Sequence, residues 1–292
     1  NSEAMSWNCR PSTSSGRLSF SKKLCYGGII MKQTIIIPVV IAILGVGVGY
    51  YLGNADFWGT ATKNVTPSNG EITPLKDAKL NIEHNATDND TGFQGFVDSE
   101  GWEQLTFTGP EGSVLTINGQ GKFGNLGLTE LFFETVEPAN ADVPIAEMLK
   151  VLPEGNYTIE GPAIEVGERK GQTKGVAWLT HNIPSGPILL APKEDAVVPA
   201  AGALVVSWSP VTTTIDGSDV NIIAYELIIQ KDEPPHPHMI GKRGLDMYLP
   251  ASVTSITVPR GFLESGTSYN WEVLAIEESG NQTLSSSKFR TQ

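Results

Sequence analysis

The longest uninterrupted apolar run of the chain lies near its N-terminus and limits what the whole chain can be. From Thr34 to Gly53 the sequence reads TIIIPVVIAILGVGVGYYLG, 20 residues without a charge. About 20 such residues span the hydrocarbon core of a bilayer as a helix. A helix buried in a soluble core would show a polar face every three or four residues, and this run shows none. The sequence therefore predicts a transmembrane helix, an anchor or signal-anchor over residues 31–53.

Charges are distributed unevenly around this run. Residues 1–33 carry five Lys or Arg residues against Glu3, a net charge of +4, which leaves −16 on the remaining 259 residues to give the total of −12. Lys and Arg tend to stay on the cytoplasmic side of a membrane. We therefore expect a single-pass protein of the cell membrane with residues 54–292 extracytoplasmic. The alternative is cleavage at Gly53-Asn54-Ala55, which has the small-x-small pattern of a signal peptidase site.

The acidic net charge argues against one class of partner, and the positions of the cysteines argue against disulfides in the exposed part. Nucleic-acid affinity depends largely on Lys and Arg neutralising phosphates, so an exposed part with a charge of −16 argues against DNA or RNA as a partner. Cys9 and Cys25 both precede the apolar run, so no disulfide is expected beyond it. Residues 1–30 are Ser-rich without apolar periodicity, and we expect a disordered or non-native extension there.

The exposed part has the composition of short strands joined by tight turns, with 31 Gly, 19 Pro and 18% charged residues in the chain. We expect an all-β fold: a linker over 54–75, a first β-sandwich module over 76–184 and a second module over 187–292. The first module is predicted to contain one short helix, Ile145 to Leu152, whose apolar residues lie on one face. Its predicted strands are Leu80–Glu83, Gln104–Thr108, Ser113–Ile117, Leu128–Glu134, Asn156–Glu160 and Val176–His181.

The second module carries a specific pattern. The segments Leu204-Val205-Val206-Ser207-Trp208, followed by Pro210, and Tyr225 to Ile229 are two predicted strands with aromatic core residues. The run Leu263, Gly266, Thr267, Tyr269, Trp271, Val273 and Ala275 follows. This pattern resembles the fibronectin type III family, which implies an immunoglobulin-like sandwich with a tyrosine corner made by Leu263 and Tyr269. The pairing of the two modules resembles exported, membrane-anchored prokaryotic proteins.

Two segments are candidate metal sites. Asp88-Asn89-Asp90-Thr91-Gly92 with Asp98 and Glu100 offers the oxygen ligands that calcium prefers, although the twelfth position is Ser99, so the loop is not an EF-hand. A plain solvated turn is the alternative. In Pro234-Pro235-His236-Pro237-His238, two imidazoles begin a zinc or copper site, and an exposed Pro-rich loop is the alternative. A metal enzyme would require His84 or His181 to approach His236 and His238.

Carboxylates around a Phe pair supply a catalytic alternative. Glu130, Glu134 and Glu137 flank Leu131-Phe132-Phe133, and two acids on either side of a glycosidic bond would cleave it. No G-x-S-x-G, H-E-x-x-H or phosphate-binding loop accompanies them.

The favoured hypothesis is a noncatalytic membrane-anchored surface protein that binds a protein, a glycan or an envelope component, with no cofactor other than possible calcium. The alternatives are an extracytoplasmic hydrolase or metal-binding protein, and a structural spacer. Binding requires an exposed aromatic or apolar patch on a sandwich face, whereas a spacer does not.

Overall fold

The computed structural model describes residues 70–239, 241–242 and 244–292. The predicted extension, the predicted membrane anchor over 31–53 and most of the predicted linker lie outside these residues. In the part of the chain that the structure describes, no helix is long and apolar enough to cross a membrane. The all-β prediction is confirmed, since strands dominate and only two short helices occur there, α1 (Lys122–Leu126) and α2 (Ile145–Met148). The second helix is shorter than predicted.

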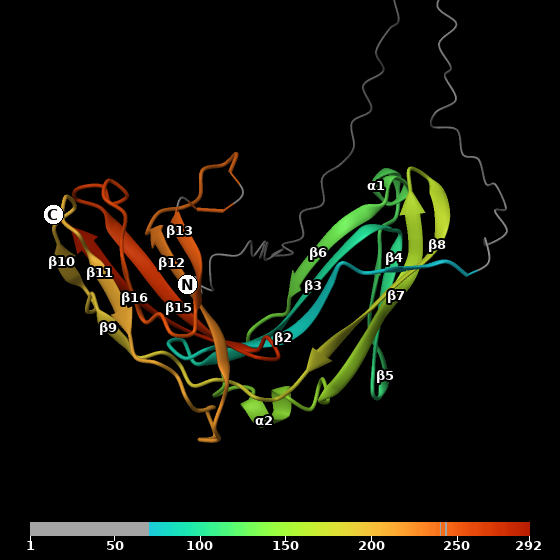
Figure 1. Cartoon of the computed structure of the whole chain (residues 1–292), viewed down its shortest axis with the longest axis horizontal. Coiled ribbons are helices and arrows are strands. Elements are labelled where there is room, and N and C mark those ends of the chain that lie inside the picture. The colour runs from blue at the N-terminus through green and yellow to red at the C-terminus, as the bar shows by residue number, and fades with distance from the viewer. Residues whose placement is uncertain (1–69, 240, 243) are drawn as a thin grey trace, which may run out of the picture. The chain divides into compact units, whose positions relative to one another are not determined.

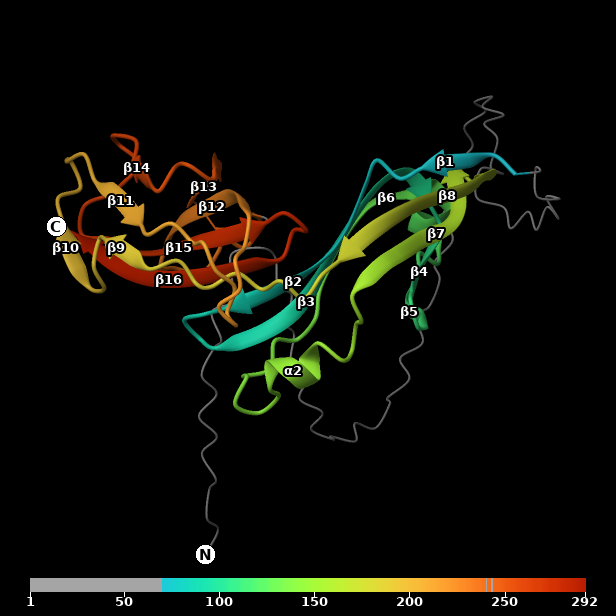
Figure 2. The same ribbon diagram turned by 60° about the horizontal axis from the view of Figure 1, so that its bottom comes forward.

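The first module packs two groups of strands around one core (Figures 1 and 2). One group has the strand order β5 (Gly112–Asn118), β4 (Gln104–Gly109), β7 (Gly155–Glu165), β8 (Glu168–Leu179) and β1 (Ile72–Pro74). The other has the order β6 (Leu128–Glu134), β3 (Asp90–Trp102) and β2 (Asp77–Asn85). A single register pair, Trp102 with Ala163, joins β3 to β7. The side chains between the groups are apolar and buried, among them Ile82, Val97, Leu105, Tyr157 and Leu179.

Strand β3 is the longest element of the first module, 13 residues, and its sequence pattern does not predict it. Glycines at 92, 95 and 101 interrupt the apolar alternation. Gly95 has a structural reason, because a Cβ there would lie 2.3 Å from the ring of Phe133 on the neighbouring strand β6. The ring therefore packs directly on the backbone of β3, and the glycine that weakens the strand signal makes this contact possible. The short strand β1 falls inside the range predicted as linker.

The second module is a fibronectin type III-like sandwich. Its three-stranded sheet has the order β14 (Ser255–Thr257), β11 (Val205–Trp208) and β9 (Leu189–Ala191). The facing strands have the order β16 (Gln282–Thr291), β15 (Ser268–Glu277), β12 (Ile222–Lys231) and β13 (Gly244–Pro250), and β10 (Ala196–Val198) pairs in parallel with β16. This layout of three strands against four is that of the family inferred from the sequence.

The aromatic core of the second module follows the predicted pattern. The backbone N–H of Glu264 donates to the hydroxyl oxygen of Tyr269 at 2.8 Å, which is the predicted tyrosine corner. Trp208 packs edge-on against Tyr225 with ring centroids 5.5 Å apart. Both tryptophans of the core, Trp208 and Trp271, are at most 1% exposed. Burial of these rings supplies a large share of the module's stability.

A parallel strand pairing joins the two modules. Residues Gln282 to Leu284 of β16 pair with Glu83 to Asn85 of β2, so the strands of both modules belong to one 13-stranded sheet. Asn281 reinforces the pairing: its side-chain oxygen accepts from the N–H of Ile82 at 2.8 Å, and its amide donates to the carbonyl of Thr180 at 2.9 Å. Asn281 is fully buried. A buried amide with its bonds satisfied fixes the register of the two strands.

Candidate functional site

The structure does not bring together the four residues of the predicted calcium site. Asp88 and Asp90 lie at the tip of the β2–β3 hairpin, where the Asn85 side chain accepts from the N–H of Asp88 at 3.0 Å. Asp98 lies eight residues beyond Asp90 on the same strand, roughly 25 Å away at the rise of an extended chain. Glu100 pairs with Lys76 at 3.1 Å. One ion cannot span this separation, and whether Asp88 and Asp90 bind calcium stays a prediction.

The histidines are also dispersed. The rings of His236 and His238 lie with centroids 5.6 Å apart. His84 lies in the first module with its Nδ1 3.0 Å from the carbonyl oxygen of Asp90, and its pKa is lowered, mainly by burial. The Nε2 of His181 lies 2.9 Å from the carbonyl oxygen of Leu152.

Among the described residues, no group of three or more potential metal ligands contains a histidine. The metal-enzyme hypothesis required such a group, so this geometry does not support it. His236 and His238 remain a predicted two-ligand site.

Three glutamates from separate segments do come together. Glu83 of β2, Glu134 at the end of β6 and Glu137 beyond it place one carboxylate oxygen each within 4.8 Å of one another. The amide of Gln94, on β3 between them, donates to Glu83 at 2.8 Å and to Glu134 at 2.9 Å. The amide of Gln282, from the second module, also donates to Glu83. We call these five residues the Glu83 network.

Burial and mutual repulsion raise the pKa of one carboxyl group in the Glu83 network and of one beside it. Burial, with Glu83 and Glu134 nearby, raises the pKa of Glu137 to about 8. Burial, with Asp88 nearby, raises the pKa of Asp90 to about 6. At neutral pH Glu137 is therefore largely protonated, which lowers the repulsion among the carboxyl groups.

Sequence reasoning found part of this network. Glu134 and Glu137 were named as candidate acids for sugar cleavage, whereas Glu130 is paired in register with Asp98, away from them. Glu83 was missed because it lies within an ordinary strand and acquires its neighbours only through β16 and β3. Glu83 is 1% exposed, so the three carboxylates lie next to one another and to amide groups instead of flanking an open groove.

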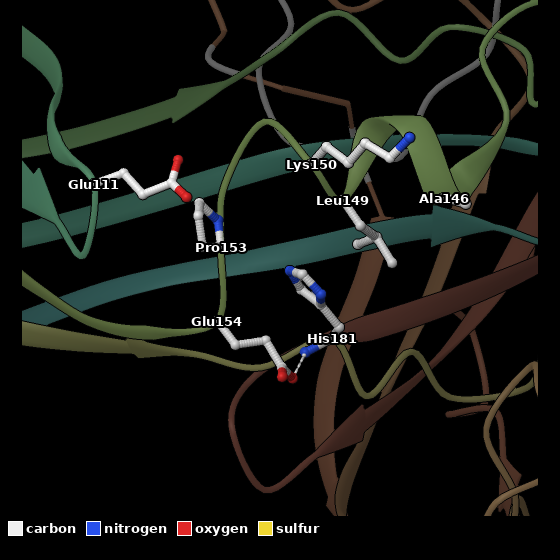
Figure 3. A pocket seen from close by; sticks show the side chains of 7 residues that line it. All are labelled: Glu111, Ala146, Leu149, Lys150, Pro153, Glu154 and His181. Atoms are coloured by element: carbon white, nitrogen blue, oxygen red, sulfur yellow. Dashed lines mark hydrogen bonds between the residues drawn. The ribbon is translucent and has the colours of Figure 1, made fainter.

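A pocket of about 570 Å³ lies beside α2 (Figure 3). The backbone N–H of His181 donates to the carboxylate of Glu154 at 2.6 Å across one side of it. Because the Leu152 carbonyl already engages the imidazole, the ring is held in place by the protein itself. The residues that line the pocket are Glu111, Ala146, Leu149, Lys150, Pro153, Glu154 and His181.

The outer face of strands β4, β7 and β8 is a different kind of surface. These strands lie side by side (Figure 1), and alternation along β8 turns Val176 and Trp178 to solvent, 54% and 52% exposed. Trp178 pairs in register with Asn156 and Val176 with Thr158. We call this surface the Trp178 face. It consists of Thr106, Thr108, Asn156, Thr158, Glu160, Lys174, Val176 and Trp178.

Charge on the Trp178 face is balanced. Lys174 and Glu160, opposite each other in the register, form an ion pair at 2.9 Å. The other polar members carry hydroxyl or amide groups. The face therefore combines one exposed indole with neutral hydrogen-bonding groups, in a chain whose net charge is −12. An exposed aromatic patch on a sandwich face is the feature by which a binding protein was expected to differ from a spacer.

This chain is similar to solved structures of fibronectin type III modules. No family model matches the chain, and no curated protein does. Fibronectin(III)-like modules of Clostridium thermocellum CbhA match at 11% identity and a TM-score of 0.31, covering 75% of this chain and 93% of theirs. A two-domain fibronectin type III segment of chicken tenascin matches at 13% identity and a TM-score of 0.26, covering 74% and 98%. The FN1–FN3 domains of chicken CNTN1 match at 11% identity and 0.29, covering 75% and 64%. The assignment of the second module rests on its own strand layout and tyrosine corner.

Proposed function

We propose that this chain is a noncatalytic, membrane-anchored protein whose extracytoplasmic part binds a glycan through the Trp178 face. The anchor is the apolar run Thr34–Gly53, and the basic residues before it favour an outward orientation of the modules. The observation that carries the proposal is the half-exposed indole of Trp178 on a charge-balanced sheet face.

The exposed half of the Trp178 side chain contributes little to the stability of the fold. Trp102, Trp208 and Trp271 are buried in the cores, where an indole contributes most to stability. A tryptophan on a strand face covered by nothing else in the described chain gains little of that stabilisation. Such a side chain is typical of a recognition surface, where one flat ring offers a large contact area with few rotatable bonds.

The neighbours of Trp178 favour a sugar as the occupant. The C–H face of a pyranose ring stacks on an indole, and its hydroxyl groups need donors and acceptors around the ring. Asn156, Thr158 and Thr108 supply these groups on the adjoining strands. The internal Lys174–Glu160 pair leaves no net charge to attract an acidic or basic partner.

A protein partner fits this face less well. A stable protein interface buries on the order of 800 Å² on each side and centres on several anchor residues. The Trp178 face centres on two apolar side chains, Val176 and Trp178, in a surround of polar groups. A spacer function leaves the exposed indole unexplained.

Binding to polysaccharides tests the proposal. The full chain in detergent is mixed with insoluble cellulose, mannan, chitin and peptidoglycan, and the bound fraction is measured after sedimentation. We expect retention on at least one of these, and loss of it in Trp178→Ala. The matched control is Tyr248→Ala, which removes an aromatic side chain of similar exposure on β13 of the second module and should retain binding.

The outcomes separate the alternatives. Retention that survives Trp178→Ala would place glycan binding elsewhere and overturn the assignment of the face. No retention on any of the four polysaccharides, together with a defined protein complex that Trp178→Ala abolishes, would make the partner a protein.

A further inference from the structure

Three exposed apolar side chains gather at one end of the first module. Phe123 and Leu126 belong to α1 and are 77% and 47% exposed, and Val166 lies in the turn between β7 and β8 and is 64% exposed. The backbone N–H of Val166 donates to the carbonyl of Leu126 at 3.4 Å, so the two segments are adjacent. Figure 1 shows α1 beside this turn. We call Phe123, Leu126 and Val166 the apolar tip.

The backbone at Val166 is unfavourable for valine. Val166 and Gly167 form the two-residue turn between Glu165 and Glu168, with φ angles of +47° and +83°. Positive φ at both central residues is the type I′ hairpin turn, which favours Asn-Gly. A β-branched residue is strained in this region. An exposed valine is present where asparagine would fold better, so its apolar side chain is not explained by the stability of the turn.

The chain enters the described structure at this same end. Strand β1 runs parallel to β8, with Ile72 in register with Gln172 (Figure 2). The N–H of Gln172 donates to the carbonyl of Glu71 at 3.0 Å. The first described residues are therefore held beside the start of β8, a few residues from Gly167. Whatever precedes them in the chain is attached to the end of the module that carries the apolar tip.

The apolar run Thr34–Gly53 precedes this attachment point by a short connection. Residues 54–69 separate the run from Gly70, and 16 residues reach at most about 55 Å when fully extended. A connection of this length allows the tip end of the first module to contact a membrane that holds the run.

Charges around the apolar tip are compatible with lipid headgroups. Arg169 pairs with Glu103 at 2.8 Å, and Lys170 pairs with Glu168 at 2.9 Å and with Glu165 at 3.5 Å. These five groups carry two positive and three negative charges and pair with one another. The apolar side chains among them can be buried at the boundary between headgroups and acyl chains.

We propose that the apolar tip inserts into the outer surface of the bilayer and orients the first module on the membrane. The inference rests on the membrane anchoring put forward under the proposed function. The contact needs no further protein, because Phe123, Leu126 and Val166 reach the acyl boundary once the anchor has brought the module close.

Lipid quenching of a fluorophore tests this insertion in the full chain. Cys9 and Cys25 are changed to Ser, and single cysteines are introduced as Ala42→Cys in the apolar run, Leu126→Cys in the tip and Val197→Cys on β10 of the second module. Each carries an environment-sensitive dye in phosphatidylcholine vesicles that contain nitroxide-labelled lipid. We expect strong quenching at positions 42 and 126 and several-fold weaker quenching at position 197.

The three positions make two failures distinguishable. Quenching at position 42 with an aqueous, unquenched dye at position 126 would overturn the tip contact and leave the anchoring intact. No quenching at position 42 would refute the anchoring, and the tip contact with it. Equal quenching at all three positions would mean general adsorption of the chain and would also overturn a specific tip.

A variant of the tip separates insertion from folding. Phe123→Ser with Val166→Asn, in the chain labelled at position 126, removes the apolar groups while giving the turn its preferred Asn-Gly pair. We expect the quenching at position 126 to fall several-fold, with no decrease in the thermal unfolding temperature. Unchanged quenching in this folded variant would show that the tip does not hold the module to the lipid.

Discussion

The core of the second module is fully buried and the Glu83 network where β2 meets β16 is partly buried, and the two are stabilised by different interactions. The core consists of rings and aliphatic side chains, such as Trp208, Trp271 and Val273, that are almost fully excluded from solvent. The Glu83 network buries carboxyl and amide groups that depend on one another for hydrogen bonds and protons. The stability that the apolar core provides falls when side-chain volume is removed. The stability that the Glu83 network provides depends on pH and on each hydrogen-bond donor.

The largest effect is expected in the apolar core. Trp271→Ala removes a ring that is fully buried, and large-to-small changes of this kind cost about 3–5 kcal/mol. We expect the free energy of unfolding, measured in urea, to fall by this amount at every pH between 5 and 9. A loss that varied strongly with pH would show that the core is coupled to the Glu83 network and would contradict the distinction between the two regions.

A smaller loss is expected at the pairing of the two modules. Asn281→Ala removes the acceptor of the Ile82 N–H and a donor to the Thr180 carbonyl, and unsatisfied buried groups cost about 1–3 kcal/mol. We expect the two modules to unfold in separate steps in the variant, seen by calorimetry. Asn221→Ala is the matched control, since that amide makes an exposed bond to Glu278 and its loss should leave the unfolding unchanged.

The pH dependence tests the Glu83 network directly. The pKa of Glu137 is raised from 4.5 to about 8, so the folded chain holds this proton more tightly than the unfolded chain. The stabilisation is fully present below about pH 4.5 and is lost as the pH rises through about 8. Glu137→Gln should remove this loss, making the variant the more stable protein at pH 9 by on the order of 1 kcal/mol, because the group is only partly buried.

Thermal unfolding between pH 5 and pH 9 measures this effect. The control is Glu100→Gln, an exposed carboxylate paired with Lys76, which should leave the pH profile of the wild type unchanged. A Glu137→Gln profile that follows the wild type would mean that other groups set the pH dependence.

The smallest change in stability is expected at the Trp178 face. Trp178→Ala removes a side chain that is half exposed, so the free energy of unfolding should change by less than about 1 kcal/mol. Set beside Trp271→Ala, this variant compares the same residue type in two settings. A loss as large as that of Trp271→Ala in urea unfolding would show that Trp178 is part of a core, and its role in recognition would need another explanation.

Sequence patterns predicted the second module better than the first. In the second module, β15 alternates Tyr269, Trp271 and Val273 with polar residues, and the register follows from that alternation. In the first module, strand β3 contains glycines that accommodate neighbouring groups such as the Phe133 ring. The need for Gly95 arises from Phe133 of β6, more than 30 residues away in sequence, so the local sequence pattern of β3 does not predict the strand.

The candidate sites show the same limit. Asp88, Asp90, Asp98 and Glu100 are close in sequence, but an extended strand carries the last two away from the first two. Glu83 and Gln282 are 199 residues apart and share a hydrogen bond. Spacing in sequence predicts a shared site only where the chain turns back on itself within the spacing, and here it does not.

The pairing of β2 with β16 has a consequence for the order in which the protein can be completed. Strand β2 is made early in synthesis, yet its partner β16 is the last strand of the second module. Between these events the edge of β2 from Glu83 to Asn85 has no strand beside it, and an open edge can pair with another chain. Domains made first generally fold first. The first module therefore has an unpaired edge until the whole second module has been produced, and the polar carboxyl group of Glu83 on that edge disfavours pairing with another chain in the interval.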